Sequence, residues 1–143
     1  MDELLKLDNQ ICFPLYVASK EVIRRYTPYL KELGLTYTQY IVFLSLWEKD
    51  GVSIKELGDK LYLDSGTLTP LINKLIRNGY ISKLKGEEDA REVLLLLTEK
   101  GKELKNKCLD IPAKIASCVK LNPEEAIIFK MLIDKIVRNF KDE

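Results

Sequence analysis

Three cysteines are the residues of this chain best suited to chemistry, and they stand at positions 12, 108 and 118. The thiolate form of cysteine is a nucleophile and a metal ligand. Histidine is absent from all 143 residues, which removes the commonest metal ligand and general base and excludes a Ser-His-Asp triad. No C-x-x-C pair occurs, so neither a structural zinc site nor a thioredoxin-type motif is indicated. We therefore expect no metal, no cofactor and no enzymatic activity, which leaves thiol chemistry or a binding surface.

The composition is that of an ordinary globular chain, with 46% apolar and 31% charged residues, and it fits one domain over residues 1–143. The net charge of +1 excludes a histone-like electrostatic binder but not a local basic patch. No stretch approaches the ~18 apolar residues of a membrane span, and the first residues, MDE, resemble no signal peptide. An odd number of cysteines suits a reducing compartment. We expect a cytoplasmic protein that does not contact the membrane.

Helix signals dominate the chain. Thr36, Ser53 and Asn122 each stand three positions before a Glu or Gln, which is the spacing of a capping box. Hydrophobic periodicity and these caps predict a first helix that starts between positions 11 and 14 and ends near 33, followed by helices at about 37–48, 54–61, 65–77, 98–118 and from 122 onward. We expect the helix at 98–118 to bend at Pro112. Residues 80–85 and 92–97 read as two short strands of a hairpin.

This order of elements predicts a fold that is mainly α with a small β-hairpin. Two short helices joined by a tight turn and followed by a two-stranded hairpin make a winged helix-turn-helix. We expect the DNA-binding part to cover about 37–98. The flanking helices, about 11–34 and 99–143, carry apolar stripes that one small domain cannot cover, so we expect them to form a dimerisation layer.

The helix that begins near Ser65 has one apolar and one polar face. The polar face carries Ser65, Thr67, Thr69, Asn73, Lys74 and Arg77. Hydroxyls, an amide and cations are the groups that contact phosphates and base edges in a major groove. The first turn also directs backbone N–H groups outward, which favours a phosphate. Each residue alone reads as a solvated surface group, but the ordered set predicts contact with double-stranded DNA.

The hairpin loop ends in an Asp-x-Arg motif formed by Asp89 and Arg91. An Asp two residues before an Arg can hold the guanidinium in one pose, so that less entropy is lost when the tip enters a minor groove. We therefore predict that Asp89 and Arg91 form the DNA-contacting tip of the wing.

Three segments carry a resemblance to a known family. Residues 61–71, LYLDSGTLTPL, resemble the recognition segment of MarR-family regulators, as does the wing motif followed by LTEKG at 97–101. Residues 8–13, DNQICF, are similar to the reactive-cysteine segment of the organic-hydroperoxide-sensing, OhrR-like branch. The resemblance covers nearly the whole chain. It implies a homodimeric repressor that binds a pseudo-palindromic operator and leaves it when Cys12 is oxidised by an organic hydroperoxide.

The resemblance also implies roles for other residues. In that branch two tyrosines of the partner subunit hydrogen-bond the cysteine, and the matching positions here are Tyr26 and Tyr37. Some members then capture the oxidised cysteine with a low-molecular-weight thiol, and others with a second cysteine of the opposite subunit. Cys118 lies about where such a resolving cysteine is expected. Cys108 sits on an apolar helix stripe, and we expect it to pack in the core.

The surroundings of Cys12 fit this reading. A place in or just before the first turn of a helix adds the positive end of the helix dipole, which favours a thiolate. We expect Ile11, Phe13 and Trp47 to provide apolar surroundings that favour bulky organic peroxides over hydrogen peroxide.

Two other functions remain open. In the first, the chain is a repressor released by a small aromatic acid or drug bound between the dimer layer and the winged helix. Cys12 is then a bystander, since free cysteines usually pack as small hydrophobes. In the second, a winged helix serves as a thiol peroxidase or a protein-interaction module.

Overall fold

The computed structural model describes residues 2–86, 88 and 91–141. Its α-helices are α1 (Cys12–Glu32), α2 (Tyr37–Glu48), α3 (Ile54–Leu61), α4 (Ser65–Arg77), α5 (Glu99–Cys108), α6 (Ile111–Val119) and α7 (Pro123–Lys141). The strands are β1 (Val52–Ser53), β2 (Ile81–Lys85) and β3 (Val93–Leu97), and two short 3-10 helices, η1 (Asp2–Leu5) and η2 (Leu7–Asn9), precede α1. None of the helices in the described residues combines the length and apolarity needed to span a membrane.

The helix starts follow from local capping. Thr36 accepts a hydrogen bond from the backbone N–H of Gln39, whose side chain accepts one from the Thr36 N–H, so α2 begins with a full capping box. Asn122 and Glu125 form the same reciprocal pair at α7. The oxygen of Ser53 accepts from the N–H of Glu56 at α3. The three predicted cap positions are confirmed.

The predicted long helix at 98–118 is two helices. Helix α5 ends at Cys108 and α6 begins at Ile111, with Pro112 in the first turn of α6. A proline ring clashes with the carbonyl of the residue four positions earlier, which here is Cys108. The bend predicted at Pro112 is therefore confirmed, but the break falls one turn earlier, where the helix can no longer continue.

The wing is part of a three-stranded antiparallel sheet with the order β1-β3-β2. Strands β2 and β3 form the predicted hairpin, with Ile81 opposite Leu97. Val52 in β1 pairs with Leu95 in β3, which adds a third strand that the sequence did not predict. Two residues are too few to show a strand period, so only their partner makes them a strand.

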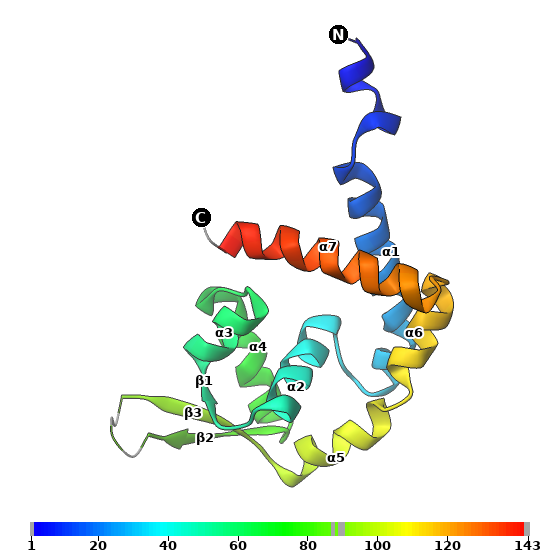
Figure 1. Ribbon diagram of the computed structural model, residues 1–143. Coiled ribbons are helices and arrows are strands. Elements are labelled where there is room, and N and C mark those ends of the chain that lie inside the picture. The colour runs from blue at the N-terminus through cyan, green and yellow to red at the C-terminus, as the bar shows by residue number, and fades with distance from the viewer. Residues whose placement is uncertain (1, 87, 89–90, 142–143) are drawn as a thin grey trace.

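The core fills the winged helix and extends to α1, α5 and α6. Phe43 and Leu46 of α2, Leu68 and Ile72 of α4 and Leu95 of β3 are almost fully buried. Helix α6 packs against α1, and α1 also packs against α2. In Figure 1, η1 and η2 extend beyond the body at one end of α1, and α7 crosses over α1 towards α3. No residue of η1, η2 or α7 is buried, and within the described residues most of the apolar stripe of α7 stays exposed.

Gly58 allows α3 to meet the turn that leads into α4. A Cβ at this position would lie 2.7 Å from the carbonyl oxygen of Leu63, and backbone cannot yield as a flexible side chain can. We expect Gly58→Ala to lower the free energy of unfolding by about 1–3 kcal/mol, measured by urea denaturation. Gly66→Ala is the matched control, because its Cβ would meet only the flexible Asp64 carboxylate at 3.3 Å. Equal stability of the two variants would contradict the close approach.

Candidate functional site

Helix α4 presents the predicted polar face to the outside. Leu68, Ile72 and Leu75 are buried on its inner side. On the outer side, the exposed residues are Ser65, Thr67, Lys74 and Arg77, and the half-buried ones are Thr69 and Asn73. The six predicted residues thus share one outward-facing side of a single helix. Their contact with DNA remains a prediction.

Two local contacts modify this face. The Asp64 carboxylate accepts a hydrogen bond of 2.7 Å from the backbone N–H of Thr67, so it takes one of the N–H groups that the sequence offered to a phosphate and adds a negative charge there. The Asn73 side-chain oxygen accepts a hydrogen bond of 3.5 Å from Lys83 of β2. Because one end of the Asn73 amide already faces the wing, its NH2 group is the end that remains for another partner.

The wing carries cations next to α4 and α3. Lys83 and Lys85 are exposed on β2, and Arg91 is exposed in the turn just before β3. Arg91 lines a shallow hollow of about 460 Å³ together with Ser53 and Lys55 at the start of α3. Asp89, the predicted partner of Arg91, lies outside the described residues. The structure therefore adds Lys55 to the basic groups of this surface, which the sequence motifs did not single out.

Cys12 occupies the first position of α1, as predicted, and its side chain is exposed. No side chain caps this helix start, so the backbone N–H groups of the first turn face the same solvent as the thiol. The neighbouring Ile11, Phe13 and Tyr16 are also exposed, with 81% of Ile11 accessible. Trp47, expected nearby, instead stacks on Phe43 and donates a hydrogen bond to the Gly101 carbonyl at the contact of α2 with α5.

Tyr26 and Tyr37 form an aromatic cluster with their ring centres 5.0 Å apart. Burial raises the pKa of both phenols, and Tyr37 adds to the rise for Tyr26 by opposing a second negative charge. Both groups therefore keep their protons at neutral pH and act as hydrogen-bond donors. The family resemblance predicts that both tyrosines contact Cys12. The structure places the two tyrosines next to each other.

The cluster and Cys12 of the same chain are far apart. Cys12 and Tyr26 both lie on α1, 14 residues apart, which corresponds to a rise of about 21 Å. A hydrogen bond between them within one protomer is therefore impossible while α1 is intact. If the two groups act on each other, they must come from different copies of the chain.

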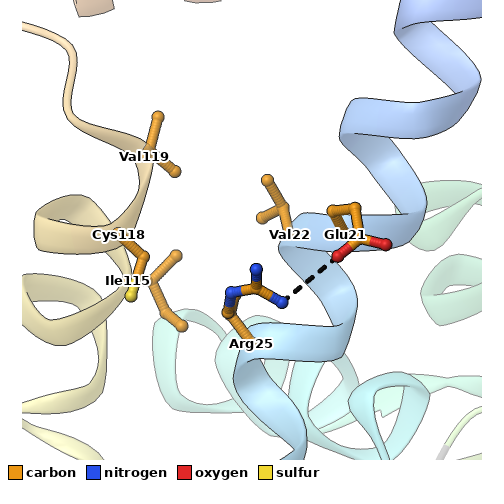
Figure 2. Close-up of a pocket in the computed structure, with 6 residues that line it drawn as sticks. All are labelled: Glu21, Val22, Arg25, Ile115, Cys118 and Val119. Carbon is orange, nitrogen blue, oxygen red and sulfur yellow. Dashed lines mark hydrogen bonds and ion pairs between the residues drawn. The ribbon is translucent and has the colours of Figure 1, made fainter.

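Cys118 lies in a small pocket between α1 and α6 (Figure 2). The pocket has a volume of about 100 Å³, and Glu21, Val22 and Arg25 line it from the α1 side. Arg25 forms an ion pair of 3.2 Å with Glu21, and Figure 2 shows its guanidinium on the side of the pocket facing α6. Cys118 is exposed and carries a free thiol. It is therefore accessible for reaction.

Cys108 behaves differently from the other two cysteines. It is only 4% exposed and belongs to the core. Burial raises the pKa of its thiol, and the nearby Asp110 charge raises it further. The prediction that Cys108 packs in the core is confirmed.

Comparison with known proteins identifies relatives over most of the chain. The sequence model of the transcriptional regulator SarA/Rot family matches residues 24–108. The organic hydroperoxide resistance transcriptional regulator of Bacillus subtilis is 46% identical over 121 residues, which cover 85% of this chain and 82% of that protein.

The solved structures of AbfR from Staphylococcus epidermidis are also similar. Reduced AbfR bound to DNA is 31% identical, with a TM-score of 0.80 and coverage of 98% of this chain and 96% of that chain. Overoxidised AbfR bound to DNA is 31% identical, with a TM-score of 0.77 over 96% of this chain and 97% of that chain. AbfR with a disulfide formed is 30% identical, with a TM-score of 0.67 over 99% of this chain and 94% of that chain.

Proposed function

Because this chain belongs to the MarR-type winged-helix transcriptional regulators, matching the SarA/Rot family and the organic-hydroperoxide-sensing branch, we propose that it is a redox-sensing repressor. It binds a pseudo-palindromic operator as a homodimer and releases it when Cys12 is oxidised by an organic hydroperoxide. DNA binding occupies about 37–98, and the helices at 11–34 and 99–143 form the dimer. Its compartment is the cytoplasm, where DNA is present and thiols stay reduced.

The main observation behind this proposal is that Cys12 lies far from the hydroxyl groups of Tyr26 and Tyr37 in the same chain, although these groups are suited to hydrogen-bond its sulfur. Cys12 is exposed at an uncapped helix start. Within the described residues, the hydroxyls of Tyr26 and Tyr37 have no hydrogen-bond partner, and neither is a buried unsatisfied atom, so both reach the surface. A second copy that brings its Cys12 to these hydroxyls satisfies both sides. The same pairing makes the dimer sensitive to the oxidation state of the sulfur.

Exposed apolar surface supports the homodimer. Phe129, Leu132, Ile136 and Phe140 form a stripe on α7, and between 41% and 69% of each is exposed in one protomer. A helix with an apolar stripe needs a partner surface to bury it. A second copy of the chain provides that surface, and its two-fold symmetry favours an operator with two half-sites, with the two α4 helices about 34 Å apart.

The chemistry has two steps. The Cys12 thiolate attacks the terminal peroxide oxygen, the O–O bond breaks, and an alcohol leaves after taking up a proton, so that a sulfenic acid forms and the peroxide is reduced. The Cys118 thiol of the partner subunit then attacks the sulfenic sulfur, which forms an S–S bond and releases water. A low-molecular-weight thiol can take the place of Cys118 in this second step.

The AbfR structures favour the disulfide as the releasing state. The reduced and the overoxidised forms of AbfR are both bound to DNA, and a disulfide form has been solved separately. Overoxidation therefore does not prevent DNA binding in that relative. A covalent link between subunits constrains the α1 and α6 helices directly, which gives a mechanical route to the spacing of the α4 helices.

The wing contribution is tested by Arg91→Ala. We expect this variant to bind operator DNA more weakly by about 1–3 kcal/mol, because a cation placed near the duplex is lost. A gel shift at fixed salt measures the change. Arg24→Ala is the matched control, since Arg24 is an exposed arginine on α1 that pairs with Glu21 rather than lying on the α4 side. Unchanged affinity of Arg91→Ala would refute the assignment of the wing.

A small-molecule trigger is the competing function, and one cavity supports it. A cavity of about 360 Å³ between α1 and the start of α2 is lined mainly by apolar groups, with Lys31 and Tyr37 as polar groups suited to an aromatic acid. In that case Cys12 would play no part in release. A gel shift on the DNA upstream of this gene, with and without cumene hydroperoxide, separates the two functions, because only the redox sensor is released by the peroxide.

A further inference from the structure

A third tyrosine completes the cluster described above. Tyr40 stands three residues after Tyr37 on α2, so both side chains lie on the same side of this helix. Its ring centre is 5.6 Å from that of Tyr26 and 6.3 Å from that of Tyr37. Only 2% of Tyr40 is exposed, which makes it the most buried of the three. The Tyr40 ring is therefore the inner wall against which the other two rings rest.

The hydroxyl group of Tyr40 is the part of this residue that points to a function. In the part of the chain that the structure describes, it has no hydrogen-bond partner, yet it is not among the fully enclosed unsatisfied atoms. The small exposed area of this residue therefore includes its hydroxyl oxygen. The Tyr40 ring is buried, but its hydroxyl lies at the edge of the tyrosine cluster without a partner. This hydroxyl can therefore form a hydrogen bond when a second subunit binds there.

The pKa of Tyr40 is consistent with the close packing of the three tyrosines. Burial raises the pKa of Tyr40 to about 12, and Tyr26, Cys108 and Tyr37 each oppose its ionisation. Such mutual effects require the three phenols and the Cys108 thiol to lie close together. At neutral pH the Tyr40 hydroxyl keeps its proton, so it can donate to a neighbouring phenol oxygen. A phenol that accepts a hydrogen bond becomes a stronger donor of its own O–H.

We propose that Tyr40 is a positioning residue of the sensing site, which orients the hydroxyls of Tyr26 and Tyr37 towards Cys12 of the partner subunit. The Tyr40 ring sets the two outer rings against each other, and its hydroxyl donates to one of their oxygens when the site is assembled. The effect on Cys12 is indirect, because the outer two phenols make the contact with sulfur. This inference rests on the proposed redox function.

The test is the rate at which the homodimer loses its Cys12 thiol to cumene hydroperoxide, followed across a range of pH. Tyr40→Phe keeps the buried ring and removes only the hydroxyl. We expect it to react about tenfold more slowly at neutral pH. The midpoint of its pH–rate profile should also lie higher, because weaker donors stabilise the reacting thiolate less. A purely structural role of Tyr40 would leave that midpoint in place.

The matched control is Tyr80→Phe, which removes a hydroxyl from a tyrosine that packs on Phe43 and lies under Lys100, outside the cluster. It should react within about twofold of the wild type. A Tyr40→Phe protein with the wild-type rate and midpoint, while Tyr26→Phe is slow, overturns the role of Tyr40 and leaves the redox function standing. A wild-type protein whose Cys12 does not react with the peroxide overturns the redox function itself. Thermal unfolding of each variant verifies that it is folded.

Discussion

Replacing Cys12 by serine is expected to leave operator binding intact and to abolish release by peroxide. In the wild type we expect cumene hydroperoxide to weaken binding by about a hundredfold, which corresponds to about 2.7 kcal/mol. Breaking or straining one polar interaction costs about 1–3 kcal/mol, and a dimer contains two such sites, so the required energy is within reach. Serine keeps the size of the side chain but has no sulfur to oxidise. A gel shift with and without peroxide measures both effects.

Cys108→Ala is the control for this result. It also removes one thiol, but a buried one whose raised pKa disfavours the reactive thiolate. We expect it to respond to peroxide as the wild type does. Equal release of the wild type and Cys12→Ser would remove Cys12 from the mechanism and favour the small-molecule trigger.

The second large effect concerns Cys118. Peroxide treatment of the wild type is expected to produce a covalent dimer on a non-reducing gel, and Cys118→Ser is expected to produce none. Glu21 is the α1 residue of the Cys118 pocket that lies nearest to Cys12, yet it is 9 positions away, or about 13 Å along the helix. A disulfide needs Cα atoms about 4.4–6.8 Å apart. This separation along α1 argues against a Cys12–Cys118 bond within one chain, so we expect the bond to join two subunits.

The same variant separates disulfide formation from oxidation alone. In Cys118→Ser, excess peroxide carries Cys12 to higher oxidation states with no crosslink. Because overoxidised AbfR is bound to DNA, we expect this variant to stay on the operator when no small thiol is present. Cys108→Ala should still crosslink. A wild-type protein that releases DNA as a monomer on the gel, with a small thiol attached to Cys12, would assign the second step to that thiol instead.

Local chemistry made much of the fold predictable from the sequence. A cap residue and its partner three positions later are close together whatever the tertiary structure is. Thr36, Ser53 and Asn122 therefore each indicate the start of a helix from local sequence alone. The same holds for the apolar period that turns Leu68, Ile72 and Leu75 inwards and leaves the polar face of α4 outside. The winged helix, the polar face of α4 and the place of Cys12 at a helix start could all be predicted in this way.

Contacts between distant parts of the chain required the tertiary structure. Strand β1 exists because Val52 meets Leu95, 43 positions later, and no pattern within two residues can show that. Asn73 faces Lys83 and Tyr40 joins Tyr26 only after α4 packs on the wing and α1 on α2. The sequence by itself determined which residue types line each helix face and where each helix begins, since those depend on neighbours along the backbone. Only packing decided that Tyr37 and Tyr40 of α2 meet Tyr26 of α1 in one cluster, because contacts between helices are set by how the helices fit together.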